Sequence, residues 1–432
     1  MSEKFKLGLT RNRLFALENT VIFTGEYADA FDEAECAKAM KMLSVKEPIT
    51  TAAIELCEDS SAYIVTDKCD PCIVFSDEPI SDVVERYERV GLDFSEHLFE
   101  FTVCGGSTLV IAAHTVACDS KSLLRLAMEF VRFYTRKSVS VDPSEIVTFP
   151  DMQSLPAKLN SPIIDKLSAD IESKWRKKRV SFDASDCKRA IEKYASEKTF
   201  VGSVEMDISS EDCGALSQYC GDNNIDLSSL IAYGFYDALV GKVNVSKKAR
   251  KMSAYSDRRL FVSDMERCSV GAFNGYVDIS FKDKGAKNAG ERMKAFHVAR
   301  YKGVTSPFRS FYDELLLMKL PPQYCDASYM NVAGCYSSSA ARRLADNYGC
   351  NDSRVMAYFS CDMRQEYWSD LSFFENVAVF EPFVRRFCAM VDSFITDEGV
   401  RAVFRYNKAG LTSDQASEIV SLAQTKIREF LP

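Results

Sequence analysis

Residues 109–126 read Leu109-Val110-Ile111-Ala112-Ala113-His114-Thr115-Val116-Ala117-Cys118-Asp119-Ser120-Lys121-Ser122-Leu123-Leu124-Arg125-Leu126. The uninterrupted apolar run at the start of this stretch predicts a buried strand. A short turn follows, with a histidine at its beginning and an aspartate at its end. Leucines at helical spacing then predict an amphipathic helix over 121–136, which Asp119 or Ser120 can cap. The stretch therefore predicts a strand, a turn and a helix in direct succession.

The sequence before this stretch predicts further strands and helices of one α/β unit. Gly105-Gly106 separates two strand-like runs, 98–104 and 107–113, and this arrangement is typical of a β-hairpin. Alternating and helical apolar patterns predict further elements at 20–25, 32–43 and 80–90.

The chain changes character after about residue 137. Four prolines with polar residues between them fall in 137–180, which predicts a crossover linker. A second α/β pattern begins near residue 200 and ends in an amphipathic helix at about 412–430. A chain of 432 residues is too long for one ordinary core. We therefore expect an N-terminal lobe at 1–165, a linker at 166–180 and a C-terminal lobe at 181–432.

Composition excludes several classes of protein. The net charge of −8 argues against a general nucleic-acid binder, because affinity for phosphates depends on Lys and Arg. The 15 cysteines are scattered and only three histidines are present, so no structural metal site is expected. The sequence has neither a signal-peptide pattern at its start nor a long apolar run. We expect a soluble cytoplasmic protein without a membrane span.

The turn at 114–120 resembles the His-His-x-x-x-Asp-Gly motif of condensation domains, chloramphenicol acetyltransferase and alcohol acyltransferases. In this alignment the first His of the motif is His114, the second is Thr115, the Asp is Asp119 and the Gly is Ser120. Weaker matches follow in the order of the family, at 25–48, 223–231, 255–260, 271–276 and 401–410. The chain thus resembles the condensation-domain and coenzyme-A-dependent acyltransferase superfamily over its whole length.

This resemblance implies an α/β fold of the α+β sandwich type, with two chloramphenicol-acetyltransferase-like lobes in a V and a tunnel between them. It also implies transfer of an acyl group from a thioester, either acyl-CoA or an acyl-carrier protein, to an alcohol or amine. In the family, the second His takes or orients the proton of the acceptor. The Asp is structural and pairs with an Arg of the second lobe, for which Arg258 is the candidate here.

The chain departs from the family at the position of the base. Thr115 stands there, and its hydroxyl is not a base at neutral pH. His114 is adjacent, but neighbouring strand residues point to opposite faces, so its imidazole turns out of the tunnel unless a bulge realigns the strand. Three hypotheses stay open: an acyltransferase that uses His114 or positioning alone, a binding or scaffold protein on this fold, or different chemistry at Cys118 or another residue. Whether the chain is an enzyme is left open.

Eight residues make up the candidate site: His114, Thr115 and Asp119 as catalytic residues, Ser120, Cys118, Asn274 and Trp368 as substrate-binding residues, and Arg258 as a structural residue. No bound cofactor is expected, and an acyl-CoA or phosphopantetheine thioester is a candidate co-substrate. The candidate partners are a small-molecule acyl donor, an acceptor and a carrier protein. The resemblance points to natural product biosynthesis as the setting.

Overall fold

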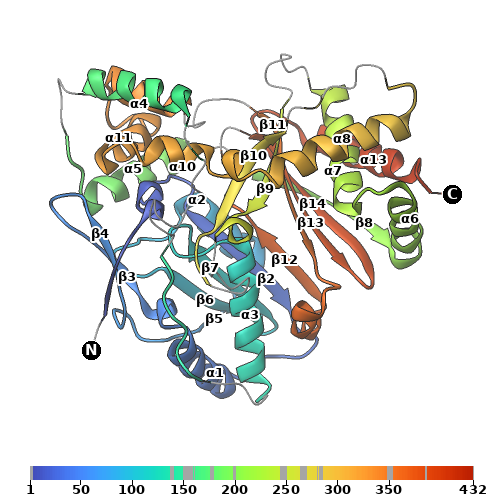
Figure 1. Ribbon diagram of the computed structural model, residues 1–432. Coiled ribbons are helices and arrows are strands. Elements are labelled where there is room, and N and C mark those ends of the chain that lie inside the picture. Colours follow the sequence, from blue (N-terminus) through green and yellow to red (C-terminus); the bar gives the residue numbers. More distant parts are fainter. Residues whose placement is uncertain are drawn as a thin grey trace.

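The computed structural model describes residues 3–136, 141–148, 159, 161–175, 180–197, 201–243, 251–262, 270–279, 281, 286–347, 354–384 and 387–431. The strands in these segments form a sheet of five strands, a sheet of six strands and a small sheet of three (Figure 1). The fold is therefore α/β, as the sequence predicts. The expected linker at 166–180 coincides in part with α4 (Pro162–Trp175), and residues 176–179 lie outside the described residues.

The five-stranded sheet carries the turn at 114–120 at the end of its central strand. Its order is β12-β2-β7-β6-β5, and β7 lies between β2 and β6 in antiparallel register. Gly105 and Gly106 join β6 to β7 with φ values of 57° and 78°, which confirms the expected hairpin. The bounds are β2 Thr20–Glu26, β5 Val74–Ser76, β6 Phe99–Cys104, β7 Thr108–His114 and β12 Asn376–Phe380.

Apolar side chains of β7 are buried on both faces of the sheet. Leu109 and Ile111 belong to the large core that also contains the apolar face of α3 (Ser120–Tyr134). Val110 and Ala112 pack instead in a smaller core together with α2 (Ile80–Val90). Burial on both sides explains why the strand is a continuous apolar run rather than an alternating one.

The six-stranded sheet has the order β10-β9-β11-β13-β14-β8. The pairs β9–β11 and β11–β13 are parallel, and the other neighbours are antiparallel. Apolar residues of α6, α7, α8 and α13 form a second core with this sheet. The bounds are β8 Val201–Ser209, β9 Met252–Asp257, β10 Asn274–Ile279, β11 Arg354–Asp362, β13 Phe387–Thr396, β14 Gly399–Asn407, α6 Ser210–Asn223, α7 Leu227–Lys242, α8 Ala289–Val304 and α13 Ser413–Arg428.

The remaining elements are shorter or lie outside the two large sheets. The small sheet has the order β1-β4-β3. The other bounds are β1 Lys4–Lys6, β3 Ala53–Leu56, β4 Ala62–Val65, α1 Glu33–Lys46, α5 Ala184–Glu197, α9 Pro307–Ser310, α10 Tyr312–Leu317, α11 Pro322–Val332 and α12 Ser339–Asn347, with 3-10 helices η1 Leu9–Arg13, η2 Pro48–Thr51, η4 Arg258–Phe261 and η5 Glu366–Phe373.

Strand β12 belongs to the second half of the chain but adds to the sheet of the first half. It pairs antiparallel with β2 and then leads through Glu381 towards β13 of the six-stranded sheet. Glu381 therefore lies where the chain passes from one large sheet to the other. The lobe boundaries expected from the sequence stay a prediction, and any division of the chain must account for this returning strand.

Arg405 of β14 fixes this crossing. Its guanidinium is 3% exposed and donates to Asp392 Oδ2 at 2.8 Å, to Glu88 Oε1 of α2 at 2.8 Å and to the main-chain oxygen of Glu381 at 2.7 Å. One buried cation thus joins a neighbouring strand, a helix of the first half and the segment after β12. Removing only the cation from such a cluster leaves a buried carboxylate unpaired.

We expect Arg405→Met to lower the free energy of unfolding by about 3–5 kcal/mol, because Asp392 loses the cation that compensates its burial. Arg401→Met on the same strand is the matched control, since Arg401 pairs with Glu205 at the surface. That change should cost less than about 1 kcal/mol. Urea unfolding of both variants measures the difference, and equal losses would contradict this role for Arg405.

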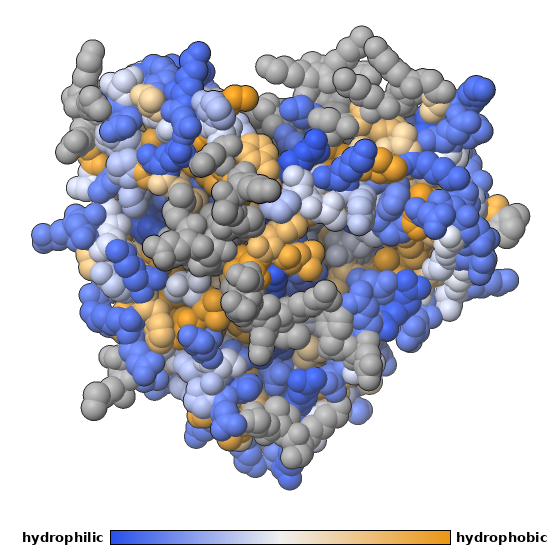
Figure 2. Space-filling model, in the orientation of Figure 1, coloured by the Kyte–Doolittle hydropathy of each residue, from blue (hydrophilic) through white to orange (hydrophobic). Residues whose placement is uncertain are grey.

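The described helices include none that is long and apolar enough to cross a membrane. The face of the molecule in Figure 2 is hydrophilic over much of its outline, and hydrophobic residues gather there in separate patches.

Candidate functional site

Asp119 organises the turn that follows β7. It is the N-cap of α3, where its Oδ1 accepts a hydrogen bond from the N–H of Ser122 at 2.9 Å. Its Oδ2 accepts from the N–H of Phe273 at 2.8 Å, which brings in the segment before β10. The side chain is completely buried. Of the two expected caps, the aspartate takes the role, and it also connects the two halves of the chain.

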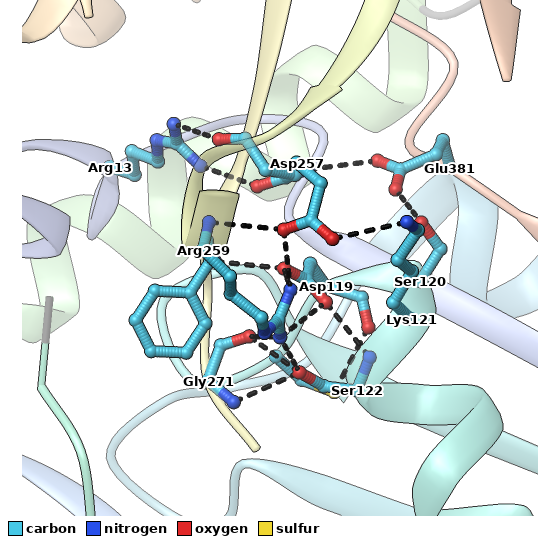
Figure 3. A network of polar contacts seen from close by, with 12 residues as sticks. Arg13, Asp119, Ser120, Lys121, Ser122, Asp257, Arg259, Gly271 and Glu381 are labelled. Atoms are coloured by element: carbon cyan, nitrogen blue, oxygen red, sulfur yellow. Dashed lines mark hydrogen bonds and ion pairs between the residues drawn. The ribbon is translucent and has the colours of Figure 1, made fainter. Parts of the chain in front are cut away.

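Arg259 of η4 compensates the charge of Asp119. Its Nη1 donates to Asp119 Oδ2 at 2.9 Å and its Nη2 donates to Asp119 Oδ1 at 3.1 Å, so the pair is bidentate (Figure 3). The same guanidinium donates to the hydroxyl of Ser122 and to the carboxylate of Asp257, and it lies over the ring of Phe273. Both members of the pair are nearly inaccessible to solvent, which makes this contact unlike an ordinary surface ion pair.

The expected pairing of Arg258 with Asp119 was wrong by one residue. Arg258 instead donates through both terminal nitrogens to Glu314 of α10, at 2.6 Å each, and through Nε to the main-chain oxygen of Ser310. Because Arg258 and Arg259 are consecutive residues of η4, their side chains leave in different directions. Arg258 therefore pairs with the carboxylate of Glu314 instead of that of Asp119.

Asp119→Asn should lower the free energy of unfolding by about 3–5 kcal/mol, because the change removes the bidentate partner of the buried Arg259 and leaves only the contact with Asp257 to compensate its charge. Asp32→Asn is the matched control: Asp32 is the exposed N-cap of α1, and asparagine caps a helix about as well. Chemical denaturation of both variants provides the comparison. A small loss for Asp119→Asn, similar to that of the control, would mean that the pair contributes little.

His114 ends β7 inside the protein and away from the cavity described below. Its side chain is completely buried, Nδ1 accepts a hydrogen bond from the N–H of Val116 at 3.2 Å, and its ring meets the ring of Phe94 edge-on. Burial lowers the pKa of His114 to about 3, so the imidazole is uncharged at neutral pH. Nε2 is buried and has no hydrogen-bond partner among the described residues.

The side chain of Thr115 lies in a different environment from that of His114. Its N–H donates to the main-chain oxygen of Asn19 at 2.7 Å, while its hydroxyl has no hydrogen-bond partner within the described segments. Thr115 lines a half-enclosed cavity of about 150 Å³ between the two halves of the chain. The polar residues that share this cavity include Arg13 of η1, Asn274 of β10, Glu314 of α10 and Glu381 after β12. The residue at the base position therefore faces the cavity, and the adjacent histidine does not.

A chain of hydrogen bonds runs along this cavity. The hydroxyl of Ser120 donates to Glu381 Oε1, and Asn274 Nδ2 donates to Glu381 Oε2 at 3.1 Å. Arg13 continues the chain by donating to Asn274 Oδ1 and to Glu314 Oε1, both at 2.8 Å. Figure 3 shows Glu381, Ser120 and Arg13 in this arrangement beside the Asp119 cluster. Glu381 is thus tied to both the motif turn and the second sheet.

Burial sets the proton affinity of Glu381. The side chain is 1% exposed, and desolvation raises the pKa of its carboxyl to about 7, although the hydrogen bond from Ser120 acts against this shift. The nearby charges of Asp119 and Asp392 contribute to this rise. In contrast, the pKa of Glu314 is held below its usual value despite its burial, because Arg258 and Arg13 lie against it.

The other predicted site residues divide between this cavity and other environments. Asn274 lines the cavity beside Thr115, and Ser120 reaches it through Glu381. Trp368 lines a different pocket of about 500 Å³, which also contains Lys121. Cys118 is completely buried, and burial raises the pKa of its thiol far above the usual range, so it holds no thiolate.

Sequence reasoning missed three functional groups of this cavity: Arg13, Glu314 and Glu381. They lie far from the motif in the chain, as Ser120 and Glu381 do at a separation of 261 residues. The only signal in the sequence is a glutamate directly after an apolar strand-like run at 376–380, and that pattern is common. Among the described residues, no group of three or more His, Cys, Asp or Glu side chains is arranged to hold a metal ion.

We expect His114 to make the protein less stable in acid. The folded pKa of about 3 lies below the unfolded value of about 6.5, so this contribution is complete above pH 6.5 and is lost as the pH falls. Between pH 7 and 5.5 the loss is roughly 1–1.5 kcal/mol. His114→Asn should remove that part of the pH dependence.

The control for this titration is His97, whose pKa is raised by the hydrogen bond to Glu100. Its stabilising contribution is present in acid and is lost as the pH rises, so His97→Asn should cost more stability at pH 5.5 than at pH 7. Urea unfolding of wild type and both variants at the two pH values measures these differences in the free energy of unfolding. If both variants changed the pH dependence of the free energy of unfolding in the same direction, the burial of an uncharged His114 would be contradicted.

No protein-family model matches the chain, and no curated protein matches it in sequence. Solved structures do match. They include the epimerization domain from the third module of tyrocidine synthetase B, at 12% identity and a TM-score of 0.61, over 100% of this chain and 96% of that one.

Two further matches come from different kinds of protein. The condensation domain of the Monacolin K polyketide synthase MokA has 10% identity and a TM-score of 0.62, over 99% of this chain and 97% of that one. The trichothecene 15-O-acetyltransferase TRI3 of Fusarium sporotrichioides has 9% identity and a TM-score of 0.62, over 100% and 96%. At these identities the likeness shows the fold alone, and that fold is the one expected from the motif at 114–120.

Proposed function

Starting from the condensation-domain and acyltransferase fold, we propose that this chain transfers an acyl group from a thioester to the hydroxyl or amine of a small acceptor. The observation that carries this proposal is the cavity at Thr115, because it lies at the motif position and draws polar residues from both halves of the chain. Proximity and orientation in such a cavity can supply several kcal/mol of barrier reduction without covalent participation of the protein.

We assign the acceptor to this cavity because of its size and its polar groups. A cavity of about 150 Å³ takes a molecule of about the size of benzene. Thr115, whose hydroxyl has no hydrogen-bond partner among the described residues, and Asn274 both line it. The reacting part of the acceptor is therefore a small group, and any larger remainder must extend out of the cavity.

We assign the thioester donor to the pocket at Trp368. This pocket of about 500 Å³ is lined by Lys121, which stands in the first turn of α3 directly after Ser120 in the chain. Lys121 is bound to Asp257 at 3.0 Å, which leaves the pocket close to neutral on that side. The pantetheine part of a phosphopantetheine arm, carried either by coenzyme A or by a carrier protein, is a neutral amide chain that suits such a pocket.

A second candidate function is binding without turnover on the same fold, and the position of His114 favours it. The imidazole is buried, uncharged and outside the cavity, so the family's proton acceptor is missing. In this case the chain would hold a thioester or its carrier and present it to another protein.

The test combines purified protein with acetyl-CoA and longer acyl-CoA thioesters, each with a panel of small alcohols and amines. We expect acceptor-dependent release of free thiol, together with an ester or amide product detected by mass spectrometry. Thr115→Phe should abolish transfer because the ring fills the cavity, whereas Thr115→Ser keeps the space and the hydroxyl and should stay within about threefold of wild type. Calorimetric binding of the same thioesters without any product would instead favour the second candidate.

A further inference from the structure

We propose that Glu381 is the proton acceptor for the acceptor's hydroxyl group, in place of the histidine that the motif leads one to expect. The inference rests on the proposed acyl transfer and deepens it by naming the base. It starts from the geometry of the cavity: Glu381 lines the same space as Thr115, while His114 lies outside it.

The carboxyl group of Glu381 is held in one orientation. Ser120 donates to Oε1 from the first residue of α3, and Asn274 donates to Oε2 from the first residue of β10. Arg405 fixes the backbone by donating to the main-chain oxygen of Glu381 at 2.7 Å. Each carboxylate oxygen can accept more than one hydrogen bond, so both can still receive a proton from a molecule in the cavity. The group is therefore fixed in position without being saturated.

The carboxylates of this region divide according to their counter-ions. Asp119 is paired with Arg259, and Glu314 is paired with Arg258 and Arg13, so these two carboxylates serve as fixed charges. Within the described residues, neutral donors bind both oxygens of Glu381, and no ion pair with an arginine or lysine is formed there. A carboxylate without a bound cation can take up and return a proton near neutral pH, which is the requirement for a general base.

Several titratable or charged groups surround Glu381 and enter its proton equilibrium. Burial and, to a smaller extent, the charges of Asp119 and Asp392 together raise the pKa of Glu381 to about 7. The groups that interact with it directly are Cys118, the α3 cap Asp119, Tyr255 on β9, Asp392 on β13 and Arg405 on β14. The charged or titratable groups that share the cavity are Arg13, Glu18, Tyr194, Arg258, Tyr276, Asp313, Glu314 and Tyr329.

The chemical step balances without a further reactant. Glu381 takes the proton of the acceptor hydroxyl while its oxygen attacks the thioester carbonyl carbon, so that a C–O bond forms and the carbonyl π pair moves to oxygen. The hydroxyl of Thr115 can donate to this oxygen, since it has no other partner in the described part of the chain. The tetrahedral species then collapses, the C–S bond breaks, and the thiolate leaves and receives the proton from Glu381. The products are an ester and a free thiol.

The test uses the full chain with the acyl-CoA and acceptor that wild type turns over best. We expect the kcat/KM of wild type to fall about tenfold per pH unit below pH 7 and to level off above it, because the base must be ionised. Glu381→Gln should lower kcat/KM by about 10²–10⁴-fold and remove this pH dependence. Glu381→Asp keeps a carboxyl group, so it should retain part of the rate and the fall of kcat/KM at low pH.

Glu129→Gln is the matched control, since Glu129 is also a buried glutamate but lies on α3 outside the cavity and pairs with Arg132. The kcat/KM of this variant should stay within about threefold of the wild-type value, with an unchanged pH profile. Circular dichroism and thermal melts of all variants exclude a loss caused by unfolding, and a Glu381→Gln variant that does not fold leaves the decision to Glu381→Asp and its pH profile.

Three outcomes separate the two proposals. Loss of rate and of pH dependence in Glu381→Gln, with an active Glu129→Gln, supports Glu381 as the base. Transfer that persists in Glu381→Gln, or that fails only in His114→Asn, overturns the assignment and leaves acyl transfer intact. Wild type without any transfer overturns the proposed function and the base together.

Discussion

The site depends on one buried ion pair, between Asp119 and Arg259. It joins the turn after β7 to η4, which follows β9, and the N–H of Phe273 adds a contact from the segment that leads into β10. An unpaired charge in this position would cost several kcal/mol, so the two halves of the chain are held in one relative arrangement at this point. The hydrogen bond between Ser120 and Glu381 lies beside this pair (Figure 3), and Glu381 also lines the cavity at Thr115.

The residues at the two histidine positions of the motif, His114 and Thr115, lie in different environments. His114 is part of the interior, where burial keeps the imidazole uncharged, and Thr115 contributes a hydroxyl to the cavity. The capacity to hold a proton near neutral pH resides instead in Glu381, a residue of the crossing between the two large sheets. Burial disfavours the charged form of both groups, so it raises the pKa of the Glu381 carboxyl and lowers the pKa of the His114 imidazole. The carboxyl therefore titrates near neutral pH, where a histidine ordinarily does.

The sequence was informative where the determining contacts are local. The strand, turn and helix of 109–134, the cap at Asp119 and the hairpin at Gly105-Gly106 follow from periodicity and backbone preference, and all are confirmed. It could not choose between Arg258 and Arg259, since adjacent residues differ only in the direction that η4 gives them. Glu381 could not be identified, because its burial and partners arise from contacts across 261 and 107 residues. The addition of β12 to the first sheet is equally non-local.

The central claim is that Glu381 exchanges a proton near neutral pH in the folded protein. The most direct measurement is a pH titration of the side-chain carboxyl resonances by carbon-13 NMR, with protein labelled at glutamate and the Glu381→Gln variant to assign the signal. The account predicts a midpoint near pH 7 for the signal that the variant lacks. A midpoint near 4.3, the ordinary value for glutamate, would contradict it.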